Sequence, residues 1–123
     1  MAIETAKIQA ALHRFVSSTN DVEGAALLTL DGLPLVSMLP SAMDEEQVAA
    51  MTAALLSLGE RIGMELLRGP IGKISLDGAD GYCIVSSCGE EAVLLVLAAP
   101  TGKQGILNLE VKRAVNEFQS LLM

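Results

Sequence analysis

Aromatic side chains are nearly absent from this sequence, since Phe, Tyr and Trp make up only 2% of its 123 residues and Trp does not occur. Proteins that bind single-stranded nucleic acids use such side chains as stacking platforms, so this function is disfavoured. Positive charge is also scarce: 8 Lys and Arg stand against 15 Asp and Glu, which gives a net charge of −7 without a basic cluster. This balance argues against binding to phosphate backbones or anionic membranes.

Long hydrophobic runs are missing as well. The longest uninterrupted apolar run covers residues 92–99, far short of the roughly 20 residues needed to cross a bilayer. Residues 1–15 contain no compact apolar stretch of the signal-peptide type and instead have helical spacing. We therefore expect a cytoplasmic protein without membrane insertion.

Cysteine occurs only twice, at Cys83 and Cys88. If both residues lie in one extended segment, their spacing of five points the two side chains to opposite faces of the sheet. A disulfide between them would then require a break in the strand. We expect two reduced, apolar side chains, which fits a cytoplasmic protein.

Aliphatic residues are abundant instead, and they show clear periodicity. A chain of this length can bury one core, so we expect a single domain over residues 1–123. Two strand–turn–strand patterns surround Asp31-Gly32 and the stretch DGADG at 77–81, and the apolar run at 92–99 is typical of a central strand. Helical spacing predicts three helices, at residues 3–18, 45–67 and 106–122. The order of elements is then α-β-β-α-β-β-β-α, an antiparallel sheet that three helices can cover on both faces.

The central predicted helix has an unusual polar side. At about 100° per residue, its large apolar residues gather on one face, which we expect to be buried: Val48, Met51, Leu55, Leu58, Ile62 and Leu66. The opposite face carries small or apolar residues between charged ones, namely Ala50, Ala53, Ala54, Ser57 and Met64. Alanine is the best helix former, so one explanation is that these residues are simply exposed.

The loop after the last strand resembles a phosphate-binding loop only in part. Gly102-Lys103 follows a strand and precedes a helix, but the motif also needs a glycine five residues before this pair and Ser or Thr after it. Leu97 and Gln104 occupy those positions. The backbone cradle and the magnesium ligand are therefore both missing, and we interpret the segment as a loop that starts a helix.

Other reactive side chains are isolated. His13 is the only histidine, and no Gly-x-Ser-x-Gly elbow presents a serine nucleophile. The stretch at 77–81 lacks the alternating ligands and closing Glu of a calcium loop, and the acidic residues at 44–46 suit a helix N-terminus. We therefore predict no catalytic, cofactor or metal site, and a protein that is not an enzyme.

Three stretches occur in a recognisable order. The first is VEGAALLTLDGLPLVSM at 22–38, where Gly-Ala precedes an Asp-Gly-Leu-Pro hairpin, and the second is the alanine-rich helix at 45–67. The third is GYCIVSSCGEEAVLLVLAAP at 81–100, followed by a loop and an amphipathic helix. Together with the order of elements they resemble the Roadblock family, the dynein light-chain and bacterial GTPase-regulator domain, over nearly the whole chain.

The resemblance implies an α+β fold (an α/β sandwich) with a five-stranded antiparallel sheet, the central helix on one face and the terminal helices on the other. It also implies a non-enzymatic homodimer that binds and regulates a small Ras-like GTPase, or a signalling or motility partner. In this family two central helices pack side by side while the following strand pairs with its counterpart, and small side chains allow the close approach. The implied dimer interface consists of Ala50, Ala53, Ala54, Ser57, Lys73, Ile74, Ser75 and Leu76.

The resemblance also suggests where the partner binds. The outer surface of the paired helices is the expected position, with Gln47, Ala50, Ala54, Arg61 and Glu65. Some bacterial relatives that stimulate a GTPase have additional C-terminal sequence that this chain lacks, so binding is implied more directly than stimulation of hydrolysis. Arg61 and Arg68 are candidates for an arginine finger only by their location on or near the long helix. The sequence leaves open the identity of the GTPase and the choice between homodimer and heterodimer.

A small-molecule sensor is the alternative function. Sheets with helices on both faces also occur in regulatory domains that bind ligands, but such a site needs a cavity with convergent polar groups. The Ala, Leu and Val content offers no obvious polar set. A metabolite-sized pocket would favour the sensor, whereas a broad two-fold apolar surface would favour the protein-binding module.

Overall fold

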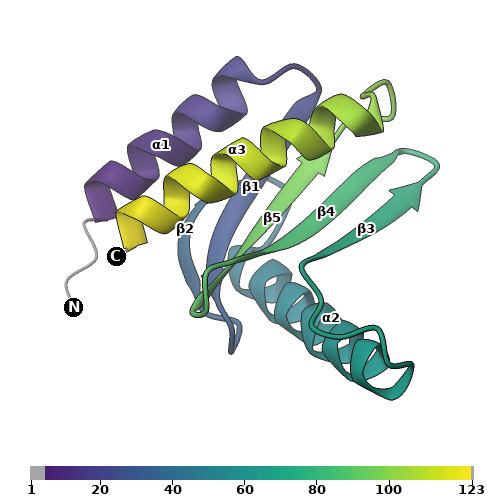
Figure 1. Ribbon diagram of the computed structural model, residues 1–123. Helices are drawn as coiled ribbons and strands as arrows, with labels where there is room; N and C mark the ends of the chain where they lie inside the picture. The colour runs from purple at the N-terminus through teal and green to yellow at the C-terminus, as the bar shows by residue number, and fades with distance from the viewer. Residues whose placement is uncertain (1–4, 123) are drawn as a thin grey trace.

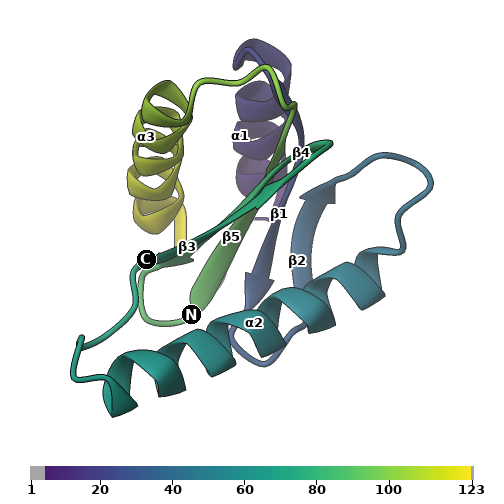
Figure 2. The same ribbon diagram turned by 90° about the vertical axis from the view of Figure 1, so that its right-hand side faces the viewer.

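Helices cover both faces of one antiparallel sheet, as the computed structural model of the protein shows for residues 5–122 (Figures 1 and 2). Helices α1 (Thr5–Ser18) and α3 (Gln104–Leu122) lie side by side on one face, and α2 (Glu45–Glu65) lies on the other. The predicted α+β fold and order of elements are confirmed. Residues 3 and 4, predicted to begin the first helix, lie outside the described residues.

The sheet has five strands in the order β2-β1-β5-β4-β3, with every neighbouring pair antiparallel. Its strands are β1 (Val22–Thr29), β2 (Pro34–Met38), β3 (Lys73–Gly78), β4 (Gly81–Cys88) and β5 (Ala92–Ala98). The central position of β5 explains its continuous apolar sequence, because helices cover both of its faces. The two hairpins predicted around Asp31-Gly32 and residues 77–81 join β1 to β2 and β3 to β4.

Two hydrophobic clusters fill the spaces above and below the sheet. The cluster under α1 and α3 includes Phe15 and Phe118, whereas the α2 side is built around Leu56, Val85 and Leu95. Among residues 5–122, no helix is both long enough and apolar enough to cross a membrane.

The two edge strands differ in length and shielding. Strand β2 is five residues long, begins with Pro34 and is joined to β1 with a register shift between Leu27 and Leu28. Strand β3 has six residues, of which Ile74 alone is half-buried and the others are exposed. The sheet therefore ends on the β3 side in an unshielded edge.

The buried face of α2 is not the predicted one. Its four buried residues are Ala49, Thr52, Leu56 and Gly63. The prediction was wrong for four positions that are exposed, namely Met51, Leu58, Ile62 and Leu66, while Val48 and Leu55 are half-buried. Close approach is the physical reason: a Cβ added to Gly59 would lie 2.6 Å from Cδ1 of Ile74 in β3. Helix α2 therefore needs small residues on the side that meets its own sheet.

The two cysteines lie on opposite faces of the sheet, as predicted. Cys83 packs against the α2-side cluster, while Cys88 belongs to the cluster under α1 and α3. Both are free thiols. Their places along one continuous strand, β4, separate them as the alternation of side chains requires.

Candidate functional site

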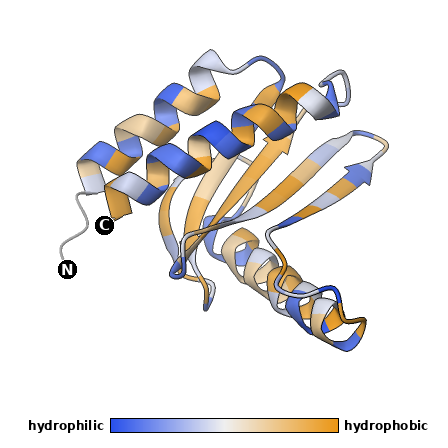
Figure 3. Cartoon of the chain, viewed as in Figure 1, coloured by the Kyte–Doolittle hydropathy of each residue, from blue (hydrophilic) through white to orange (hydrophobic). Residues whose placement is uncertain are grey.

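A row of large apolar side chains runs along the solvent side of α2. We call Met51, Leu55, Leu58, Ile62 and Leu66 the apolar row. Met51 is 58% exposed, Leu58 56% and Ile62 48%, and their spacing of three or four residues aligns them on one helix surface. Leu55 is half-buried and packs against the α2-side cluster, so apolar surface continues from the core to the solvent. The hydropathy colouring shows how much of α2 is apolar (Figure 3).

The unshielded edge of β3 lies next to this part of α2. Ile74 meets the helix at Gly59, the neighbour of Leu58. Leu76, two positions further along β3, points to the same face of the sheet and is 48% exposed. The apolar row and the β3 edge are thus two parts of one candidate interaction site.

The backbone of β3 has free hydrogen-bonding groups along this edge. The Ser87 N–H donates to the Gly72 carbonyl at 2.9 Å, one step before the paired residues Lys73 and Ser86. In an antiparallel pair the bonds alternate along the strand. The N–H and C=O groups of Lys73, Ser75 and Asp77 therefore point away from β4, toward solvent.

The small residues predicted at the dimer interface do not all share one environment. Ala50 and Ala53 lie against the β1–β2 turn, where a Cβ on Gly32 would be 3.4 Å from Cα of Ala50 and 3.4 Å from Cβ of Ala53. Ala53 is half-buried there, whereas Ala54 and Ser57 are exposed. Of the four β3 positions, Lys73, Ser75 and Leu76 are exposed and Ile74 is half-buried. The interface expected at these eight positions stays a prediction.

The five residues predicted to bind a partner are all exposed: Gln47, Ala50, Ala54, Arg61 and Glu65. At about 100° per residue they form one stripe on the side of α2 that points away from the sheet. We call them the outer stripe. Arg61 Nε lies 3.7 Å from Oε1 of Glu65 in an exposed ion pair, so the stripe presents both charge signs beside alanine.

An open hollow lies where α2 ends, and it was not predicted from the sequence. It has a volume of about 720 Å³ and is lined by Ser57, Glu60, Arg61, Met64, Leu67 and Pro70. Leu67 is 86% exposed and has a positive φ of 60°, at the position after a helix where glycine is favoured. The signal in the sequence was the pair Leu66-Leu67 directly before Arg68-Gly69, because apolar residues there continue beyond the helix end.

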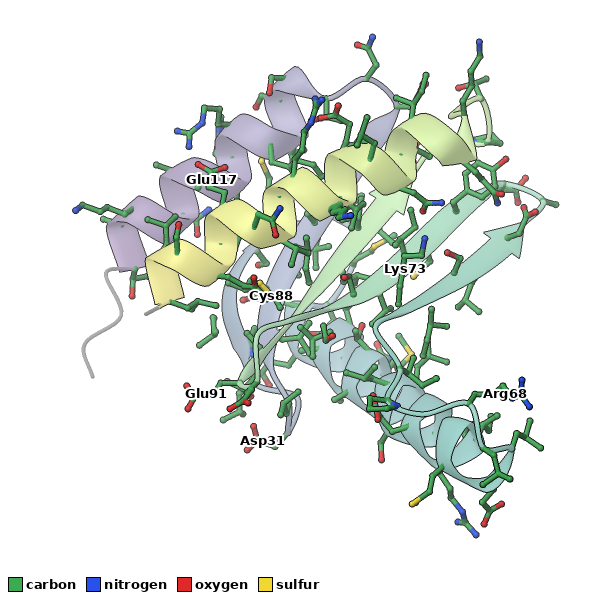
Figure 4. The ribbon with its side chains drawn as sticks, viewed as in Figure 1. Asp31, Arg68, Lys73, Cys88, Glu91 and Glu117 are labelled. Atoms are coloured by element: carbon green, nitrogen blue, oxygen red, sulfur yellow. The ribbon has the colours of Figure 1, made fainter. Side chains whose placement is uncertain are left out.

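Three charged side chains at or near this hollow, Glu60, Arg61 and Arg68, already have partners. Oε1 of Glu60 accepts a hydrogen bond from the Ile71 N–H at 3.1 Å, and Arg61 pairs with Glu65. Arg68 donates from Nε to the Leu66 carbonyl at 3.0 Å and its side chain points away from the molecule (Figure 4). An open, mostly apolar hollow without convergent polar groups suits a protein surface better than a metabolite.

The other side chains considered for catalysis or ligand binding do not come together in one site. Lys103 precedes α3, but Asp21 and Glu110 line the hollow next to it, and their carboxylates disfavour a phosphate group. His13 is exposed, with Nδ1 3.4 Å from Oγ of Ser17. Over residues 5–122, the structure contains no cluster of three or more His, Cys, Asp or Glu side chains that could hold a metal ion.

Burial sets the chemistry of the two thiols. It raises the pKa of Cys88 to about 11, and it raises the pKa of Cys83 as well. The Cys88 thiol donates to the Val115 carbonyl at 3.7 Å beneath α3 (Figure 4). A raised pKa keeps a thiol protonated and unreactive near neutral pH, so neither cysteine has the properties of a nucleophile.

Comparisons with known proteins agree with this geometry. A Methanocaldococcus jannaschii protein described as uncharacterized is 27% identical over 106 residues, which cover 86% of this chain and 92% of that protein. Among solved structures, the Roadblock/LC7 domain from Streptomyces avermitilis aligns with a TM-score of 0.86 at 23% identity, covering 94% of this chain and 97% of that one. Myxococcus xanthus MglB aligns with a TM-score of 0.90 at 20% identity, covering 100% and 96%.

The sequence profile of one domain family matches most of the chain. The match to the Roadblock/LC7 domain extends over residues 8–98, from the first turn of α1 to the end of β5. These residues include both parts of the candidate site, the apolar row and the edge of β3. The chain therefore belongs to the Roadblock/LC7 domain family.

Proposed function

We propose that this protein is a non-enzymatic regulatory scaffold that acts in the cytoplasm as a homodimer and binds a small Ras-like GTPase. One observation carries the proposal: large apolar side chains of α2 are exposed directly beside an unpaired strand edge. A monomer would expose both to water, whereas a second copy would cover both at once.

The two features suit a symmetric interface. In a two-fold dimer the same patch is used twice, so the patch must be complementary to itself. An apolar helix row can pack against its own copy, and an open antiparallel edge can pair with its own copy. Pairing would satisfy the outward backbone groups of Lys73, Ser75 and Asp77 and would bury Met51, Leu58 and Ile62 between helices.

The dimer is tested by placing charge in the apolar row. Leu58→Glu and Ile62→Glu should make the protein monomeric in sedimentation at micromolar concentration, because an unpaired carboxylate is costly to desolvate. Ile106→Glu is the matched control, since Ile106 is equally apolar and 58% exposed but lies on α3, and it should leave the dimer intact. Ala54→Glu in the same assay tests the interface predicted at the alanine positions.

A monomeric wild-type protein would contradict the dimer outright. If the wild type is dimeric and both row variants remain so, while circular dichroism shows that they are folded, the interface lies elsewhere. Loss of the dimer in Ile106→Glu as well would point to a general effect of added charge instead of a specific contact.

The GTPase is proposed to bind at the outer stripe of α2. After dimerisation the two outer stripes would flank the helix seam as a shallow platform in which alanine is surrounded by Arg and Glu. Apolar surface with a charged rim is typical of transient interfaces. The open hollow near Leu67 adjoins this platform at Arg61 and offers room for an apolar side chain of the partner.

Binding is tested with small Ras-like GTPases of the source organism, loaded with GDP or with a non-hydrolysable GTP analogue. Arg61→Glu and Glu65→Lys should each weaken binding by about tenfold or more without dissociating the dimer. Arg113→Glu, at an exposed position on α3, reverses the charge as Arg61→Glu does and should leave affinity unchanged. If only the α3 variant weakens binding, the partner binds the opposite face of the sheet.

A further inference from the structure

The sequence of β3 is symmetric in its chemistry. Lys73-Ile74-Ser75-Leu76-Asp77 reads as cation, aliphatic, hydroxyl, aliphatic and anion, with Ser75 at the centre. Reversing the direction of this strand exchanges the cation with the anion and leaves the aliphatic pattern in place. An antiparallel copy centred on Ser75 would therefore bring opposite charges and like apolar groups face to face.

The backbone permits this alignment. The outward N–H and C=O groups belong to Lys73, Ser75 and Asp77, as the bond between Ser87 N–H and the Gly72 carbonyl requires. With Ser75 opposite its own copy, each outward residue faces another outward residue of the second strand. Shifting the strand by one residue would place outward groups against inward ones and break the ladder. Shifting it by two would leave one of the three residues without a partner inside the strand.

The side chains at the two ends lack a charge partner among residues 5–122 of the same copy. Lys73 lies at the start of β3 (Figure 4), and it lines a hollow with Lys112 of α3 in which no lining residue is a carboxylate. Neither Lys73 nor Asp77 forms an ion pair within residues 5–122. An anion arriving beside Lys73 would therefore meet two uncompensated cations.

We propose that two copies of this chain join in a register centred on Ser75, with Lys73 of each copy opposite Asp77 of the other. Directly opposite side chains of an antiparallel pair have Cβ atoms about 5 Å apart, which is suitable for an ion pair. Ile74 then lies opposite Leu76 of the second copy on the α2 side of the sheet, next to the apolar row. This inference rests on the proposed homodimer and specifies its alignment.

The register also selects the partner. A related chain without an anion at the position of Asp77, or with a cation there, would leave Lys73 unpaired or facing a like charge. Like charges directly opposite one another destabilise a strand pair, so the arrangement favours a second copy of this chain over a heterotypic partner. The charge pairs make the chain prefer a second copy of itself, while the apolar row supplies most of the affinity.

Charge exchange tests the register. Lys73→Asp and Asp77→Lys each place like charges opposite one another twice per dimer, so each variant alone should dimerise about tenfold more weakly at low salt. An equimolar mixture should form heterodimers in native mass spectrometry, because Asp at 73 then faces Lys at 77. The double variant should dimerise like the wild type. Lys103→Asp and Asp31→Lys are the matched controls and should change little.

A cross-link gives an independent measurement. Opposite residues of a hydrogen-bonded pair have Cα atoms about 5.5 Å apart, which fits a disulfide. In a Cys83→Ala background, Ser75→Cys should therefore form an intermolecular disulfide on mild oxidation, whereas Asp77→Cys should not, since it faces Lys73.

The outcomes separate the register from the dimer itself. If the single charge variants dimerise like the wild type and Ser75→Cys does not cross-link, the register is overturned while the homodimer stands. If the wild-type protein is monomeric by sedimentation, both proposals fail. Weak single variants that neither form heterodimers nor recover in the double variant would also overturn the register, because they indicate damage to the strand.

Discussion

Cys88 is the residue whose surroundings change its chemistry most clearly. Only 1% of it is exposed, it belongs to the cluster under α1 and α3, and its thiol donates to the Val115 carbonyl. Burial disfavours the charged thiolate, which explains the rise of its pKa from 9.0 to about 11. The protonated thiol here acts as a small apolar side chain with one weak donor.

The raised pKa of Cys88 predicts a loss of stability in alkali. The unfolded chain loses the proton near pH 9, whereas the folded protein keeps it to about pH 11, so the stabilisation is fully present below pH 9 and decreases as the pH rises through this window. We expect the free energy of unfolding to fall by about 1–3 kcal/mol more in the wild type than in Cys88→Ala. Urea unfolding of both proteins across this pH range measures the difference, and parallel curves would contradict it.

Helix α2 packs against its own sheet through a face that carries small residues, among them Ala49, Gly59 and Gly63. Helical periodicity correctly predicts that the large apolar residues share one face, and it cannot say which face meets the sheet. That choice depends on how near the helix lies to β3 and to the loop before it, at Gly59 and Gly63. These are long-range contacts, which a pattern of neighbours along the chain does not contain.

The two glycines predict a matched pair of effects on stability. A Cβ at Gly63 would lie 2.6 Å from the backbone carbonyl oxygen of Gly69, whereas at Gly59 the obstacle is the flexible Cδ1 end of Ile74. Alanine gains about 1 kcal/mol of helix propensity over glycine at both sites. We expect Gly63→Ala to destabilise the protein by about 1–2 kcal/mol net and Gly59→Ala to be nearly neutral.

Thermal unfolding of the two alanine variants gives the comparison directly. A Gly63→Ala protein as stable as Gly59→Ala would mean that the loop at Gly69 moves away without cost. The helix end would then be less tightly fixed than its contacts indicate.

For the whole molecule, local signals were sufficient to predict the order of elements and the antiparallel sheet, while the placement of α2 opposite the terminal helices was predicted only through the family resemblance. The Asp31-Gly32 turn, the continuous apolar run of β5 and the spacing of the terminal helices each depend on residues close together in sequence, and all three agree with the structure. The candidate site could not be predicted from local patterns, because it depends on contacts between elements that are far apart in the sequence. The exposure of Leu58 and Ile62 and the hollow at Leu67 depend on which surfaces other elements cover, so the sequence predicted an interface on α2 without identifying the apolar side that is free.

The design of β2 has a consequence for how far assembly can proceed. If copies join through β3, the β2 strands become the outer edges of the joined sheet. Strand β2 is short, begins with Pro34 and has a register shift against β1, and these features discourage the addition of a further strand. In a pair joined this way, one edge would bind the second copy and the other would end the sheet, so growth would stop at a closed pair and would not continue into a fibre.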